Sequence, residues 1–122
     1  MAEEIIFNCE NVVGIITLNR PSRLNALTHD LVKQMTKFLD HCEGDDSIKC
    51  VIIEGAGEKA FCAGGDVVAL RKTVLDEGGP PTELSERFFY DEYLLNYKIN
   101  NFKKPYIALI DGVTMGGGVG VS

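Results

Sequence analysis

Two short apolar runs, each followed by a glycine cluster, constrain the fold of this 122-residue chain more than any other feature. The runs are CVII at Cys50–Ile53 and YIALI at Tyr106–Ile110, and the clusters are FCAGGDV at Phe61–Val67 and TMGGGVG at Thr114–Gly120. Continuous apolar runs of this length are typical of strands that are buried on both faces of a parallel sheet. Because glycine loses more conformational freedom on folding than any other residue, the clusters indicate a requirement for bare backbone.

The first third of the chain predicts a hairpin and an amphipathic helix. EEIIF and VVGIITL are rich in strand-forming residues and flank NCEN, so we expect Glu4–Phe7 to pair with Val12–Leu18 across a turn at NCEN. Thr28 can then cap a helix over His29–Cys42. The apolar residues of this helix recur at helical spacing and predict one buried stripe; they are Leu31, Met35, Phe38, Leu39 and Cys42.

The rest of the chain repeats one order of elements. After the first glycine cluster, VVALRKTVL predicts a short helix at Val67–Leu75, and DEGGPP predicts a surface loop. Helical spacing returns from Leu84 to about Asn101, and the second cluster is expected to open another helix. The order strand, glycine loop, helix therefore occurs twice. It predicts an α/β architecture with right-handed parallel crossovers.

Composition argues against several classes of partner. A net charge of −6 does not suit a nucleic-acid groove, which needs a basic face. No apolar run approaches the roughly 20 residues of a membrane-spanning helix. The cysteines lack the close spacing of zinc ligands, so we expect reduced thiols, including at Cys62, which has no histidine on a neighbouring motif to activate it. The four cysteines are Cys9, Cys42, Cys50 and Cys62.

Three uses of the glycine clusters follow from their chemistry. They can be tight strand-to-helix turns, or they can cradle a phosphate, or their backbone N–H groups can form an oxyanion hole for a carbonyl that gains negative charge. A phosphate-binding loop is the least favoured, because no Lys-Ser/Thr pair follows TMGGG. The dinucleotide pattern also fails, since its register from Gly116 ends on Val121.

Four motifs in order resemble the enoyl-CoA hydratase/isomerase (crotonase) superfamily: NRPSRLNAL, KAFCAGGDV, KPYIALIDG and TMGGGVG. The resemblance runs from about Val12 to Ser122. It implies a fold of repeated ββα units that binds acyl-CoA thioesters. Because the chain stops at GGGVGVS, inside an expected element, we interpret residues 1–122 as the N-terminal part of a single crotonase-like domain.

The resemblance also implies roles for particular residues. The backbone N–H groups of Gly65 and Gly117 would form the oxyanion hole around the thioester oxygen. Glu92, within YDEYLLN, would bind substrate, and the loop Arg23–Leu27, including Ala26, would lie along the CoA moiety. No metal or redox cofactor is implied, because CoA is part of the substrate. A homo-oligomer is compatible with the resemblance.

The same acidic and basic residues also have simpler interpretations. Glu92 lies on a predicted helix rich in acids, which is typical of a solvated helix face. Asp66 is placed to cap the following helix, and Asp111 to end a strand at a turn. His29 and His41 are expected to lie away from both glycine clusters and receive no role.

Gly120 separates the reactions of the superfamily. Hydratases place a catalytic glutamate three residues after the middle glycine, and here that position is Gly120, which cannot act as an acid or base. In thioester hydrolases of the superfamily a glycine is expected there, and a Glu and an Asp from further downstream do the work. The sequence therefore favours a hydrolase over a hydratase or isomerase, and a non-catalytic CoA-binding fragment is the remaining alternative. The resemblance points to mitochondria, with peroxisomal and cytoplasmic locations left open.

Overall fold

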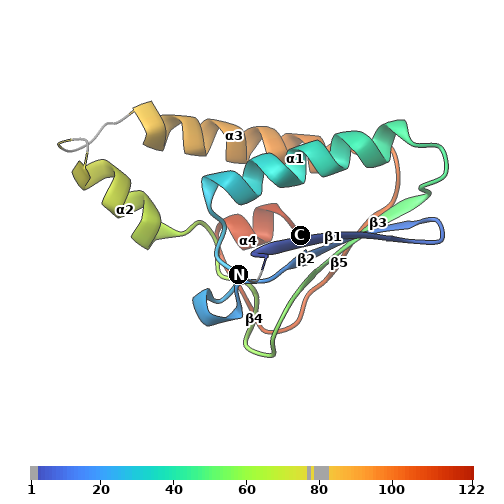
Figure 1. Cartoon of the computed structure of the whole chain (residues 1–122), viewed down its shortest axis with the longest axis horizontal. Helices are drawn as coiled ribbons and strands as arrows, with labels where there is room; N and C mark the ends of the chain where they lie inside the picture. Colours follow the sequence, from blue (N-terminus) through green and yellow to red (C-terminus); the bar gives the residue numbers. More distant parts are fainter. Residues whose placement is uncertain (1–2, 77, 79–82) are drawn as a thin grey trace.

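A four-stranded sheet forms the base of the structure, and helices lie over one of its faces (Figure 1). The computed structural model describes residues 3–76, 78 and 83–122. The strand order is β1-β2-β3-β5, in which β1 and β2 are antiparallel while β2–β3 and β3–β5 are parallel. The strands span Ile5–Glu10 (β1), Val13–Leu18 (β2), Cys50–Gly55 (β3) and Tyr106–Leu109 (β5). The predicted α/β class with parallel crossovers is confirmed.

The N-terminal hairpin is present, but its turn is not at NCEN. Asn8 and Cys9 belong to β1 and pair with Ile15 and Gly14 of β2. The turn consists of residues 11–12, between the paired residues Glu10 and Val13. Asn11 has a φ of 54°, a left-handed conformation that asparagine tolerates better than most residues. This conformation lets the chain reverse within the two residues of the turn.

The helices lie close to their predicted positions. α1 spans His29–Gly44, two residues beyond the expected end, and the Leu31 N–H donates to the Thr28 Oγ1 that caps it, at 3.2 Å. α2 spans Val67–Asp76 and α3 spans Glu83–Asn100. The loop predicted at DEGGPP falls largely outside the described residues.

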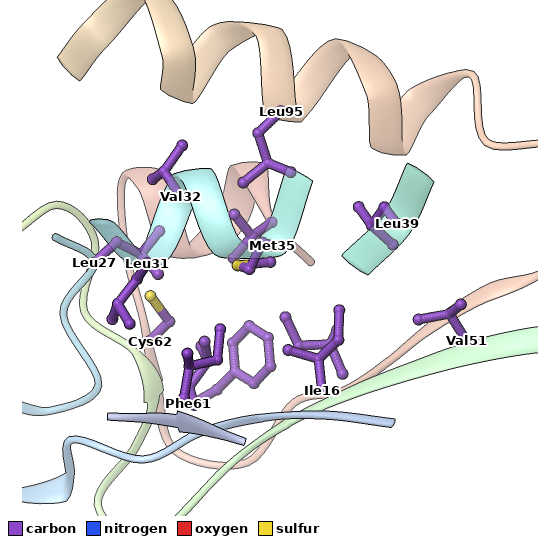
Figure 2. Close-up of a cluster of buried hydrophobic side chains, with 14 of the residues drawn as sticks. Ile16, Leu27, Leu31, Val32, Met35, Leu39, Val51, Phe61, Cys62 and Leu95 are labelled. Carbon is purple, nitrogen blue, oxygen red and sulfur yellow. The ribbon is translucent and has the colours of Figure 1, made fainter. Parts of the chain in front are cut away.

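The hydrophobic core lies between α1 and the sheet. Figure 2 shows α1 side chains above Ile16 and Phe61, with Leu95 reaching the cluster from α3. The predicted stripe of α1 is buried except for Phe38, which is partly buried and stacks on Phe7 with ring centroids 4.5 Å apart. Through this core α1 fixes both the sheet and α3.

The prediction that β3 and β5 are buried on both faces is wrong for this chain. Val51 and Ile53 of β3 are buried, whereas Ile52 between them is only half-buried. In β5, Ile107 and Leu109 are exposed at 45% and 50%. The cause is that the helices cover one face of the sheet only (Figure 1).

A second, smaller sheet carries the glycine clusters. β4 (Ala60–Cys62) pairs in parallel with β6 (Val113–Thr114), and α4 (Gly117–Gly120) follows β6. The glycine clusters therefore begin in β4 and β6. The prediction that they come directly after β3 and β5 is wrong. Strands this short carry no readable periodicity, and neither does the 3-10 turn at Pro21–Arg23.

None of the described helices combines the length and the apolar character that crossing a bilayer requires.

Asn25 tests how strongly this fold depends on one buried amide. Asn25 is 1% exposed; its Nδ2 donates to the carbonyls of Ala56 and Ala60, and its Oδ1 accepts from Arg20 N–H, each at 2.9 Å. We expect Asn25→Ala to lower the free energy of unfolding by about 3 kcal/mol, because the buried Ala60 carbonyl and the part-buried Ala56 carbonyl and Arg20 N–H lose their partners. Denaturant titration measures this loss. Asn101→Ala, at an exposed position, is the control and should change the value by less than about 1 kcal/mol.

Candidate active site

The two glycine clusters lie in backbone contact with each other. β4–β6 pairing sets Cys62 opposite Thr114, and the Met115 N–H donates to the Cys62 carbonyl at 3.1 Å. A Cβ on Gly118 would overlap that carbonyl, and a Cβ on Gly64 would lie 3.0 Å from the Met115 oxygen. Only glycine permits this approach, which answers why the chain has bare backbone at both places.

Gly65 and Gly117 both line one hollow. Among the described residues, the N–H group of neither glycine donates to an acceptor. Gly117 is the first residue of α4, where an N–H has no acceptor within the helix. The Gly65 nitrogen lies only 3.4 Å from the point where a Cβ of Gly117 would be. The two donors therefore adjoin each other on the wall of a hollow of about 320 Å³.

Glu92 of α3 is buried beside these donors. It is 6% exposed, and its Oε1 lies so close to Gly117 that a Cβ there would overlap it. The interpretation of Glu92 as part of a solvated helix face is therefore wrong. Burial raises the pKa of its carboxyl group above the ordinary value, and no hydrogen bond or ion pair ties it to another described residue.

The remaining wall of the hollow is mostly apolar and aromatic. Phe88 lies against the first glycine cluster, with its Cζ 3.3 Å from the Cβ position of Gly65. The hollow thus combines an apolar lining with a few convergent polar groups, as small-molecule sites usually do. The apolar and aromatic lining residues are Val67, Leu70, Phe88, Phe89 and Tyr93.

Asn96 is a polar lining residue that the sequence interpretation missed. It stands four residues after Glu92, so both side chains project from one face of α3 into the hollow. A Cβ on Gly120 would lie 2.6–2.9 Å from the atoms of the Asn96 amide group. The four-residue spacing from Glu92 was the available signal for Asn96. That spacing indicates a site residue only when α4 is known to pack against this face of α3.

The loop around Ala26 is tied to the first glycine cluster, although Ala26 does not line the hollow. Leu27 N–H donates to the Gly64 carbonyl at 2.7 Å, and Asp66 N–H donates to the Leu27 carbonyl at 2.7 Å. The Ala26 carbonyl accepts a hydrogen bond from Arg20 Nη1 at 2.6 Å. The structure thus places Ala26 one residue from the contact with Gly64.

Asp66 caps α2, as predicted. Its Oδ1 accepts from the Ala69 N–H at 2.9 Å, and its Oδ2 pairs with Arg20 Nη2 at 2.9 Å. Burial alone would raise the pKa of this carboxyl group, but the hydrogen bonds from Ala69 and Arg20 hold it below the ordinary value. Asp66 is therefore a charged structural residue between the loop and the helix.

His29 does not lie away from the first cluster, which corrects the expectation. Its Nε2 lies 2.6 Å from Asp91 Oδ2, and its ring meets Phe88 edge-on at 5.9 Å between centroids. With Asp66 it also lines a separate hollow of about 140 Å³. The helical spacing of the sequence could not show that α3 brings Asp91 and Phe88 against the start of α1.

Two other kinds of chemistry, a nucleophilic Cys62 thiol and a bound metal ion, find no support in the described part of the chain. Burial raises the pKa of the Cys62 thiol to about 11, so it is protonated at neutral pH and is a poor nucleophile. Within residues 3–76, 78 and 83–122, no three His, Cys, Asp or Glu side chains gather as metal ligands would.

Comparison with known proteins shows which family the chain matches. The sequence profile of the family described as "Enoyl-CoA hydratase/isomerase" matches residues 13–122. The chain is 47% identical to the mitochondrial 3-hydroxyisobutyryl-CoA hydrolase of Danio rerio, matching 98% of this chain and 30% of the relative. For the Homo sapiens protein of the same name the identity is 44%, over 99% of this chain and 30% of the relative. The chain thus spans about a third of the length of these curated relatives.

Solved structures of the same fold include two bacterial proteins. One is a carnitinyl-CoA dehydratase from Mycobacterium thermoresistibile, with a TM-score of 0.90 and 46% identity over 98% of this chain and 34% of the other. The other is an enoyl-CoA hydratase from Rhodobacter sphaeroides, with a TM-score of 0.91 and 36% identity over 98% of this chain and 35% of the other. The predicted crotonase-like fold is confirmed for the part of the fold that this chain covers.

The burial of Glu92 makes stability depend on pH. A carboxyl group whose pKa is raised on folding destabilises the folded state when it is charged. The contribution of Glu92 to stability therefore falls as the pH rises from the ordinary pKa of 4.5 through the raised pKa of the folded state. We therefore expect Glu92→Gln to be more stable than the wild type at about pH 7. This advantage should disappear below pH 4.5.

Unfolding of both proteins across this pH range measures the difference. Glu86→Gln, an exposed position on the same helix, is the matched control and should give no pH-dependent gain. A Glu92→Gln protein that is less stable than the wild type at pH 7 would contradict the assignment of an unpaired buried carboxylate.

Proposed function

Because this chain belongs to the enoyl-CoA hydratase/isomerase family, we propose that the protein carrying it is an acyl-CoA thioester hydrolase. The substrate we propose is 3-hydroxyisobutyryl-CoA, which hydrolysis converts to 3-hydroxyisobutyrate and free CoA. Curated relatives named 3-hydroxyisobutyryl-CoA hydrolase, about 45% identical to this chain, support the choice of substrate. The observation that carries the proposal is that Gly65 and Gly117, whose N–H groups have no acceptor among the described residues, line the same hollow as Glu92.

In this proposal Gly65 and Gly117 stabilise the transition state. A hydroxyl derived from water attacks the thioester carbonyl carbon, and negative charge develops on the carbonyl oxygen. Two N–H donors that are already oriented and free of other acceptors can bind that charge without reorganising. The C–S bond then breaks, and the CoA sulfur leaves as the thiol after protonation.

Glu92 and the apolar wall bind the acyl group. The aromatic lining accommodates the methyl-bearing part of a short branched acyl chain, and Glu92 supplies a polar anchor among these residues. We place the CoA moiety along the Arg23–Leu27 loop, with Ala26 in contact. That loop is joined to the first glycine cluster by three backbone hydrogen bonds.

Gly120 favours hydrolysis over hydration. The glutamate that hydratases of the family carry at this position is replaced by a glycine whose α-carbon packs against the Asn96 amide. We propose that a Glu and an Asp beyond Ser122 supply the acid and base, and that residues 1–122 are the N-terminal part of one domain. The names of the relatives support a mitochondrial location. A place in valine breakdown is part of the proposal and depends on the proposed substrate.

Hydration of an enoyl-CoA is the second candidate. It is favoured by the likeness to the carnitinyl-CoA dehydratase, at 46% identity, and to the enoyl-CoA hydratase. The two reactions differ in their products, because only hydrolysis releases a free thiol while hydration removes the absorbance of the conjugated double bond.

The first test assays the full-length protein with both kinds of substrate. We expect 3-hydroxyisobutyryl-CoA to release free thiol, and methacrylyl-CoA to lose no absorbance from its double bond. Loss of that absorbance without thiol release would overturn hydrolysis and support the second candidate.

The second test isolates the Gly117 donor. Gly117→Ala and Gly117→Pro both add a Cβ that overlaps Glu92, but only proline removes the N–H group. Proline is tolerated at the first position of a helix, so α4 can still form. We expect kcat for thiol release to fall by about 10²–10³-fold more in Gly117→Pro than in Gly117→Ala. Equal losses in the two variants would exclude this N–H from the oxyanion hole.

A further inference from the structure

Among the described residues, Asn96 carries the one side-chain polar atom that is fully shielded from solvent and has no hydrogen-bond partner. This atom is Oδ1. Buried amide oxygens are nearly always paired, and an exception calls for an explanation. The amide nitrogen has no partner among the described residues either. Asn96 therefore brings an unused polar group to the wall of the hollow.

The position of the amide is set by Gly120. The Asn96 Nδ2, Oδ1 and Cγ atoms would all lie within 2.6–2.9 Å of a Cβ at residue 120, so the amide plane rests on the bare α-carbon. The oxygen is covered in this arrangement. Since Asn96 nevertheless lines the hollow, its nitrogen is the amide atom that a ligand can reach.

Asn96 and Glu92 form a matched pair along the contact between α3 and α4. Glu92 packs against Gly117 and Asn96 packs against Gly120, so two polar side chains one helical turn apart meet two glycines nearly one turn apart. A carboxylate accepts hydrogen bonds and an amide nitrogen donates them. A hydroxyl group is the substituent that can satisfy both, because it donates to the carboxylate and accepts from the amide.

We propose that Asn96, together with Glu92, binds a hydroxyl group on the acyl chain and so selects hydroxyacyl-CoA thioesters over acyl-CoA thioesters that lack the hydroxyl. This inference rests on the proposed thioester hydrolysis for its assay and adds a specificity-determining residue to it. A role in packing alone would be served better by leucine, which has a similar volume and carries no polar group that must be desolvated. A site that pairs with a substrate hydroxyl discriminates against the analogue without it, because its polar groups are then left unpaired.

The test compares two substrates on each variant of the full-length protein. The substrates are 3-hydroxyisobutyryl-CoA and isobutyryl-CoA, and the readout is the ratio of their kcat/KM values for thiol release. We expect Asn96→Leu and Asn96→Ala each to lower this ratio by about tenfold or more, the effect of losing one hydrogen bond of useful strength. Asn100→Ala, an exposed position one turn further along α3, is the control and should leave the ratio unchanged.

Because each ratio is measured within one variant, a partial loss of folded protein cancels. An unchanged ratio in both Asn96 variants, or equal falls for the two substrates, would overturn the proposal. Binding of the two thioether analogues of these substrates, measured by calorimetry, keeps the test independent of hydrolysis. If no thiol is released but the hydroxylated analogue binds more tightly and loses that preference in Asn96→Leu, the specificity role stands and hydrolysis fails. If wild-type protein binds both analogues equally or neither, the specificity role fails.

Discussion

The site depends on the close approach of two backbone segments that are about 50 residues apart in sequence. Pairing of β4 with β6 brings Cys62 and Thr114 together. The glycines that follow let the two backbone segments touch without Cβ atoms between them. Both free N–H groups are by-products of this contact. Gly65 lies between Gly64 and Asp66, which both hydrogen-bond to Leu27, and Gly117 begins α4. A side chain at Gly64 or Gly118 would meet the backbone of the opposite segment and force the two segments apart.

Several polar groups that line the same hollow have no partner among the described residues. Two N–H donors, a buried carboxyl group and an amide converge on a wall that is otherwise apolar. Each of these groups carries a desolvation cost in the folded chain that nearby residues do not offset. Such costs are common where a protein keeps groups ready for a ligand, because partners inside the protein would have to be displaced on binding.

The sequence was sufficient for the elements with strong local signals. α1 has a capping threonine and a long apolar stripe, and the glycine clusters marked the two segments that the structure brings into contact. β4 and β6 were missed because three-residue and two-residue strands have no periodicity, and their pairing is decided by tertiary contacts. The burial of Glu92 and the role of Asn96 could not be predicted either, since both depend on which face of α3 meets α4. His29 was misplaced because the sequence could not show that α3 brings Asp91 against the start of α1.

The packing of Asn96 on Gly120 has a consequence for how such sites diverge. A glutamate at residue 120 would collide with the amide, and a smaller residue at 96 would leave a gap beside Gly120. Either change alone therefore passes through a poorly packed protein, and only the pair is well accommodated. The two positions should be inherited as a unit, so a lineage that exchanges one chemistry for the other crosses a stability barrier at this helix contact.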